Sequence, residues 1–250
     1  MRTTLFITIL LLFPVLLNAQ YDLEKSNLYF GLRAGAGYSG ITNVGEILIS
    51  ESYYSGYTLE NESRFGVNAG AYLSIAFPGM YFGIQPEVGY SRQGCSLGYS
   101  DINDLTYTVD FNYSYLTAGL MIKAYPLKGL AVFVGPQVGF NLSPNDIKYT
   151  SNDSNGQKYG SADIKVQQQL QNVLKGRTDF ALSVGLGYEF KFGLNVDFRY
   201  LHGLSDVIET QVNSYKFIEN SNHSHSLQLS VGYAIPFSGY DGGGSGSRRR

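Results

Sequence analysis

The sequence contains little charge, a single cysteine and no tryptophan. Asp, Glu, Lys and Arg make up 15% of its 250 residues, against about a quarter in an average soluble domain. Lys and Arg number 18 and Asp and Glu number 20, a formal net charge of -2, so no basic surface for nucleic acid is expected. The lone Cys95 excludes an intramolecular disulfide framework. Beyond the N-terminus, no apolar run is long enough for a membrane-spanning helix.

Glycine and aromatic residues are abundant instead. The chain has 30 Gly, 21 Tyr and 15 Phe, and 44% of its residues are hydrophobic. Many aromatics with a low net charge argue against a disordered chain. Gly and Tyr in place of Ala, Leu, Glu and Lys argue against a helical bundle.

The first 19 residues have the layout of a secretory signal peptide. Arg2 is followed by 13 mostly apolar residues from Leu5 to Leu17, and Leu17-Asn18-Ala19 offers a cleavage site. The apolar run is shorter than the roughly 20 residues of a spanning helix; an uncleaved anchor is the alternative. We therefore predict a signal peptide at 1–19, one domain at 20–237 and a flexible Gly/Ser/Arg tail at 238–250, either natural or added.

Eight segments of the mature chain alternate between apolar and small or polar residues, which is typical of strands with two different faces. From Leu28 to Tyr38, for example, Leu, Phe, Ala and Tyr occupy one face while Gly and Arg dominate the other. The predicted strands are Leu28–Tyr38, Phe65–Phe77, Tyr81–Ser91, Tyr113–Tyr125, Leu130–Leu142, Phe180–Lys191, Leu194–Leu201 and Leu227–Phe237.

The predicted connections alternate between short and long. Short Pro- and Gly-containing turns lie at 78–80, 126–129 and 192–193, and long polar segments lie at 39–64, 92–112, 143–179 and 202–226. This arrangement predicts an all-β fold: an eight-stranded antiparallel up-and-down transmembrane β-barrel with short periplasmic turns and long extracellular loops. A short helix is expected at 166–174 in the third loop, as a packed cap or a partner-binding element.

A soluble secreted barrel also has eight alternating strands, so the composition of the polar face decides. That face is mostly Gly, Ser, Asn and Gln, whereas a water-exposed face would carry many Lys and Glu. Aromatics gather at both strand ends, as in the two interfacial belts of membrane barrels. The belt at the loop end contains Tyr38, Phe65, Tyr90, Tyr113, Phe140, Phe180 and Tyr200. The belt at the turn end contains Phe30, Phe77, Phe82, Tyr125, Phe190, Phe192 and Phe237.

Several segments also carry a family resemblance. "YFGIQPEVGYSRQG", "YLTAGLMIKAYPLKGLAVFVGPQVGFNLS", "DFALSVGLGYEFKFGLNVDFRYLHGLSD" and the closing "HSLQLSVGYAIPF" resemble the outer-membrane β-barrels abundant in Bacteroidota that are often labelled PorT-like. The resemblance spans nearly all of 28–237, apart from the long loops, and implies an outer-membrane location and a barrel fold. It implies little about function. The tail after Phe237 departs from the family pattern, in which the terminal aromatic ends the chain.

The predicted inward faces carry seven charged residues, and we expect them to form a lumen network: Arg33, Glu87, Lys123, Glu189, Lys191, Asp197 and Arg199. Eight strands leave a lumen just wide enough for side chains, and buried charges must pair. A turn over Lys191 to Gly193 would place Asp197 opposite Gly187 and Arg199 opposite Gly185. Pro86 and Pro136 fall within strands of a ring without edges, so we expect a bulge at each.

No catalytic, cofactor-binding or metal-binding residue is expected. His223 and His225 could share a metal, but no third ligand pattern joins them. His202 lies near Asp206 and several serines, which leaves a lipid A-modifying enzyme as a minor alternative without a nucleophile motif.

The leading hypothesis is a non-enzymatic outer-membrane protein with a filled lumen, acting in envelope structure or surface binding. A narrow passive pore or a secretion and transport component is the alternative. The expected partners are outer-membrane lipid and lipopolysaccharide, the barrel-assembly machinery during insertion, and an extracellular protein or glycan bound through the loops.

Overall fold

The computed structural model describes residues 28–48, 56–77, 81–158, 160–218 and 221–236. The predicted signal peptide at 1–19, the tail at 238–250 and the predicted turn at 78–80 lie outside the described residues, as does Phe237. Within these ranges, no helix is long and apolar enough to span a bilayer.

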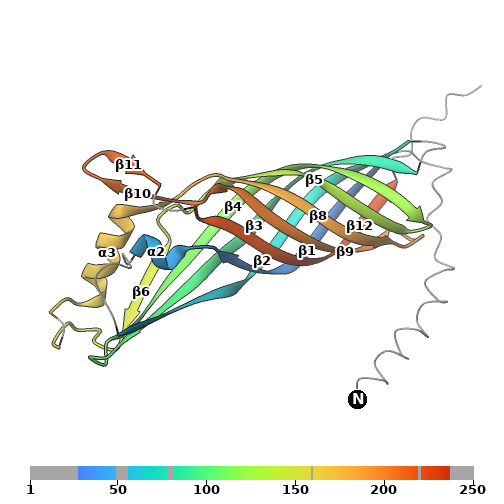
Figure 1. Ribbon diagram of the computed structural model, residues 1–250. Coiled ribbons are helices and arrows are strands. Elements are labelled where there is room, and N and C mark those ends of the chain that lie inside the picture. Colours follow the sequence, from blue (N-terminus) through green and yellow to red (C-terminus); the bar gives the residue numbers. More distant parts are fainter. Residues whose placement is uncertain (1–27, 49–55, 78–80, 159, 219–220, 237–250) are drawn as a thin grey trace, which may run out of the picture.

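Eight long antiparallel strands form a closed ring, as predicted (Figure 1). Each strand pairs with the next one along the chain, and the last pairs with the first, so no barrel strand is left at an edge of the ring. The strands are β1 (Leu28–Ile41), β2 (Tyr57–Ala76), β3 (Phe82–Asp101), β4 (Thr106–Leu127), β5 (Leu130–Asn141), β8 (Asp179–Glu189), β9 (Leu194–Asp206) and β12 (His223–Pro236).

The outward face of the ring is an apolar band. Leu32, Leu120 and Val231 are each about half exposed, and aliphatic residues of the other strands surround them. Aromatics border this band toward the loop end at Tyr38, Phe65, Tyr90, Phe140, Phe180 and Tyr200. The prediction that all of the belt aromatics face the lipid is wrong for two of them. Tyr113 and Tyr125 point inward and are buried, because each lies on the opposite face of β4 from the lipid-facing Leu116 and Ile122.

The predicted bulges at the two prolines are also wrong. Pro86 stands opposite Leu120 in an unbroken β3–β4 register, and the β2–β3 register is the same on both sides of Pro86. The β4–β5 register is likewise the same on both sides of Pro136. The missing proline N–H therefore interrupts the ladder locally without inserting a residue.

The barrel strands extend well beyond the predicted boundaries at the loop end. The predicted loop at 92–112 is mostly strand: β3 continues to Asp101, β4 begins at Thr106, and only four residues connect them. Predicted loop residues at the ends of β1, β2, β9 and β12 are also strand. In β2 a register shift between Ser63 and Asn68 changes which residues face inward.

Small elements cover the loop end of the ring (Figure 1). They are α2 (Val44–Leu48), β6 (Ile147–Ser151), α3 (Asp163–Val173), β7 (Leu174–Gly176), β10 (Ile208–Val212) and β11 (Tyr215–Phe217). We call these elements, together with the strand ends that they cover, the cap. The cap encloses a hydrophobic core whose buried members are Ile41, Val44, Cys95, Leu97, Val109, Phe111, Tyr113, Tyr115, Ile147, Leu174, Val207 and Ile208.

The helix α3 confirms the predicted helical segment, and its side chains form hydrogen bonds with backbone groups at the edge of β6. Gln171 Nε2 donates to the carbonyl of Ile147 at 2.8 Å, and Gln167 Oε1 accepts from the backbone N–H of Tyr149 at 3.1 Å. Asp163 accepts from the backbone N–H and the hydroxyl of Ser151. Residues four apart lie on one face of a helix, so three side chains of α3 replace a missing neighbour strand. An edge covered in this way is protected from pairing with another chain.

The apolar band predicts a position-dependent cost for charge. Val231 is 51% exposed near the middle of β12, so Val231→Arg should lower the free energy of unfolding by about 2–4 kcal/mol, the cost of Arg at the bilayer midplane. Val212 in the cap has a similar exposure, 42%, and Val212→Arg should cost less than about 0.5 kcal/mol, because water surrounds it. Urea unfolding in lipid vesicles measures both, and equal costs would contradict the assignment of the band.

Candidate functional site

Six of the seven predicted lumen charges lie inside the ring, and four form one connected cluster. Arg33 donates two hydrogen bonds to Glu87, at 2.7 and 2.9 Å, a bidentate pair. Arg199 binds the same carboxylate at 2.8 Å and also reaches Asp197 at 3.3 Å. Glu87 is therefore the shared acceptor of two guanidinium groups that come from strands β1 and β9.

Lys123 and Glu189 form a second pair, with Nζ 2.6 Å from Oε1. The hydroxyl of Tyr125 donates to the same oxygen at 3.4 Å. These six side chains carry three positive and three negative charges, so the charges within this network balance. The guanidinium of Arg199 also lies 4.6 Å from the centre of the Phe133 ring, a cation–π distance.

Lys191 is the exception, and its predicted place in the network is wrong. β8 ends at Glu189, and Lys191 lies exposed in the turn that leads to β9. β8 ends two residues before the end of the predicted strand, so the alternation no longer applies at this position.

Glycines stand opposite the long charged side chains. Asp197 pairs with Gly187 and Arg199 with Gly185, the register that the predicted turn required. Arg33 lies between Gly70 and Gly232, and Glu87 lies opposite Gly119. A Cβ at Gly187 would come within contact distance of the Asp197 carboxylate. The missing side chains leave the room in which the network forms.

Toward the loop end the lumen changes from charged to polar and then to apolar. Gln93 donates to Ser91 at 3.2 Å, and Ser230 donates to Asn68 at 2.8 Å, with both donors buried. Above this level lies the cap core, in which Phe111 and Tyr113 are fully buried. The burial of Cys95 in this core raises the pKa of its thiol to about 12, so the thiol stays neutral and serves as a small apolar side chain.

The structure places two of the histidines side by side, but it does not pair His202 with Asp206. His225 lies directly opposite His202, and His223 lies opposite Asp206. His202 and Asp206 are four residues apart on one strand, about 13 Å, far beyond hydrogen-bond reach. Among the described residues, no group of three His, Cys, Asp or Glu side chains could hold a metal ion.

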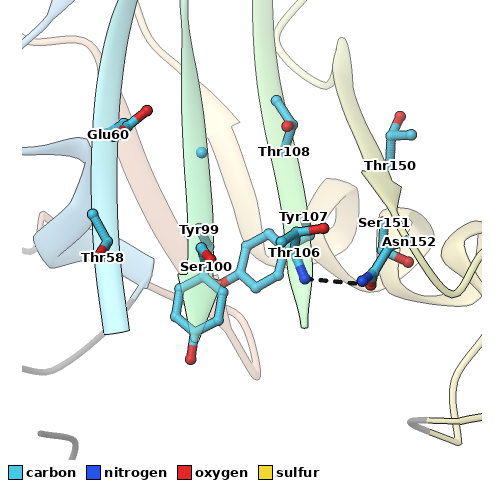
Figure 2. Close-up of a pocket in the computed structure, with 11 residues that line it drawn as sticks. Thr58, Glu60, Tyr99, Ser100, Thr106, Tyr107, Thr108, Thr150, Ser151 and Asn152 are labelled. Carbon is cyan, nitrogen blue, oxygen red and sulfur yellow. Dashed lines mark hydrogen bonds between the residues drawn. The ribbon is translucent and has the colours of Figure 1, made fainter. Parts of the chain in front are cut away.

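The outward face of the cap carries a groove that was not predicted from the sequence. It has a volume of about 410 Å³ and crosses four strands, β2, β3, β4 and β6 (Figure 2). Register pairs arrange its floor in two rows. Glu60, Gly98, Thr108 and Thr150 form one row, and Thr58, Ser100, Thr106 and Asn152 form the other. Tyr99 and Tyr107, whose rings stack 4.5 Å apart, also line it.

The edge of the groove is held in place by Asn152. Its Oδ1 accepts from the backbone N–H of Thr106 at 3.3 Å (Figure 2), and its side-chain amide donates to the carbonyl of Asp104. These bonds fix the end of β6 to the β3–β4 hairpin. The alternation of Thr with Tyr at 106–108 and 149–150 marks a polar strand face, but only the register shows that the rows adjoin.

Because two arginines share the Glu87 carboxylate, substitutions within the lumen network should lower the free energy of unfolding by unequal amounts. Glu87→Ala leaves Arg33 without a carboxylate and Arg199 with only Asp197, so it should lower the free energy of unfolding by about 3–5 kcal/mol. Arg33→Ala should cost less, because Arg199 still neutralises Glu87. The double variant should cost less than the sum of the two. Because the chain lacks Trp, urea unfolding is followed by circular dichroism and gel migration without boiling.

Lys191→Ala serves as the control for this network, with an expected loss below about 0.5 kcal/mol, because its side chain is exposed in a turn. Additive costs for Arg33→Ala and Glu87→Ala would show that the two side chains act independently.

The glycines predict a second contrast in stability. A Cβ at Gly185 would lie 2.5 Å from both the Phe198 carbonyl oxygen and the Phe133 ring, so Gly185→Ala should cost about 1–3 kcal/mol through overpacking. At Gly98 the nearest atom would be 3.8 Å away, so Gly98→Ala should be neutral or stabilising by up to about 1 kcal/mol. The same urea titration measures both, and a similar loss at the two positions would contradict the role assigned to Gly185.

Comparison with known proteins agrees with this geometry. The profile of the outer membrane protein beta-barrel domain family matches residues 18–209. Similar solved structures include OprG from Pseudomonas aeruginosa, with 11% identity and a TM-score of 0.41 over 84% of this chain and 97% of that chain. Neisserial surface protein A has 11% identity and a TM-score of 0.39, covering 82% and 97%.

Ail, the attachment invasion locus protein of Yersinia pestis, has 12% identity and a TM-score of 0.35, covering 84% of this chain and 99% of that chain. No curated protein matches the chain. The family profile covers more than three quarters of the sequence. The chain therefore belongs to the outer membrane protein beta-barrel domain family, and its location is the outer membrane.

Proposed function

We propose that this protein is a non-conducting, non-enzymatic outer-membrane barrel that binds partners at the cell surface through its cap. Barrels of the outer membrane carry short turns on the periplasmic side and longer connections outside. The elements α2, β6, α3, β10 and β11 all belong to the longer connections. On this basis the cap faces the exterior.

The observation that carries the proposal is the double closure of the lumen. An ion entering from the turn end would first meet the Lys123–Glu189 pair and then the cluster of Arg33, Glu87, Asp197 and Arg199, whose members are bound to one another. Beyond it lies the cap core around Phe111 and Tyr113, whose buried members are mostly apolar and so replace little of the water around an ion. An ion crossing the lumen would have to pass both the charged network and the mostly apolar core. This double block favours a structural and binding role over a passive pore.

The cap supports the binding part of the proposal, because it is a folded platform rather than a set of independent loops. Helix α3 holds the edge of β6, and β6 extends the sheet of β4. An extracellular protein or glycan is the partner class we propose for it. Lipid and lipopolysaccharide would contact the apolar band, and the barrel-assembly machinery would act during insertion. The finer assignment to the PorT-like barrels of Bacteroidota rests on the quoted segments.

Single-channel recording tests the closed lumen. We expect the mature protein in a planar lipid bilayer to show no steady conductance at 150 mM salt, because the lumen network and the cap core both block the path. A bilayer without protein gives the baseline, and insertion is verified by protease protection of the barrel. Stable conductance steps in the wild type that persist in the Glu87→Gln variant would overturn the non-conducting role and favour transport.

A further inference from the structure

The groove on the cap offers hydrogen-bonding groups that the protein itself leaves unused. In the described part of the chain, the hydroxyls of Thr58, Ser100, Thr108 and Thr150 make no hydrogen bond to other residues. A hydroxyl donates one hydrogen bond and accepts two. The floor therefore presents a row of unengaged donors and acceptors toward the solvent.

Gly98 lies in the middle of this floor, and the fold does not require a glycine there. Most strand glycines of the protein stand against an atom that would lie closer than 3.0 Å to a Cβ, whereas the nearest atom to a Cβ at Gly98 is 3.8 Å away. Its φ is not positive. A glycine weakens a strand and often marks a place where a ligand approaches the backbone closely. The absence of a side chain at Gly98 therefore leaves open space over the floor of the groove and does not serve the packing of the strand.

The charge of the groove restricts the ligand. No Lys or Arg is among its lining residues, so it lacks the groups that recognise sulfate, phosphate or carboxylate. Glu60 is exposed, and within the described residues it forms no ion pair. A carboxylate accepts hydrogen bonds only. The groove thus combines one acceptor of high strength with several neutral hydroxyls.

We propose that this groove binds a neutral glycan, with one sugar ring lying over Gly98. The sugar hydroxyls donate to the Glu60 carboxylate and exchange hydrogen bonds with Thr58, Ser100 and Thr108. This inference rests on the proposed surface-binding function and assigns a ligand class to it. Its volume of about 410 Å³ lies within the usual range for small-ligand sites.

The arrangement of the floor favours a glycan over a peptide strand. An extended peptide commonly binds by adding to a free sheet edge. The central strands of the floor, β3 and β4, are paired on both sides, β3 with β2 and β4, and β4 with β3 and β6. What the groove offers is a face with hydroxyls about 4.8 Å apart across strands and about 7 Å apart along them. A polyhydroxylated ring can use such a face without any main-chain pairing.

The test uses the mature chain in lipid nanodiscs and isothermal titration with defined probes. The neutral probes are cellohexaose, maltohexaose, chitohexaose and mannohexaose; dextran sulfate is the anionic probe and hexalysine the cationic one. We expect at least one neutral hexasaccharide to bind and dextran sulfate not to bind at this groove. Glu60→Gln should weaken binding about tenfold or more, through loss of charge-assisted hydrogen bonds.

Two further variants separate the groove from the rest of the cap. Gly98→Leu should abolish binding by filling the space over the floor, with folding checked by gel migration without boiling. Glu62→Gln is the matched control, because Glu62 is exposed on the same strand but does not line the groove. It should bind like the wild type.

Failure to bind any neutral probe, or unchanged binding by both Gly98→Leu and Glu60→Gln, overturns the inference. Binding of hexalysine alone also overturns it, while the surface-binding role stands. Failure of the proposed function itself would be seen separately, as conductance of the wild type in the planar bilayer.

Discussion

The width of an eight-stranded ring is the constraint on which the rest of this structure depends. Eight strands enclose a lumen that side chains fill, so every inward residue must fit beside those from the opposite wall. Long charged side chains fit only where a neighbouring strand carries glycine, as at Gly185 and Gly187. Charges held so closely must also balance, and three cations face three carboxylates. The abundance of glycine and the scarcity of charge both follow from this geometry.

The apolar and polar faces of the strands exchange sides at the aromatic residues that border the band toward the loop end. In β4 the even-numbered Leu116, Leu120 and Ile122 face outward and are apolar, whereas the odd-numbered Val109 and Phe111 are buried inside the cap. Next to lipid the outside must be apolar, and the interior can be polar because its groups bind one another. Next to water the preference reverses, and the ring gains an interior like that of a soluble protein. The apolar residues of β4 therefore change from odd-numbered to even-numbered positions, a change of parity, between Tyr115 and Leu116, where β4 leaves the band.

This change of parity explains what could and could not be predicted from the sequence. The eight segments within the band were recognised because their alternation is continuous, and the register at Gly187 and Asp197 followed from one turn. The predicted loops include these extensions because the apolar residues lie on the other face there, as at Cys95 and Leu97 in β3, or because a register shift in β2 displaces the pattern. A pattern of apolar residues that switches parity within one segment is a sequence signal for a strand that leaves the membrane.

The lumen network was predictable as a set of residues, but its connections were not. Inward position follows from parity, so the sequence alone predicts six of the members. The prediction for Lys191 is wrong because the alternation ends at Glu189. That Glu87 would serve two arginines depends on the circular order of β1, β3 and β9, which no local pattern contains.

The groove was even harder to predict from the sequence, because it depends on residues that are far apart in the chain. Its residues come from four strands, two of which, β4 and β6, are separated in the chain by β5. Its outer strand exists only because Asp163, Gln167 and Gln171 of α3 replace the neighbour that β6 lacks. A helix that reads in the sequence as a small cap over a loop thus completes a flat polar sheet face. Where the wall leaves the lipid, the outward face becomes polar, and this is the surface that a soluble ligand outside the membrane can reach.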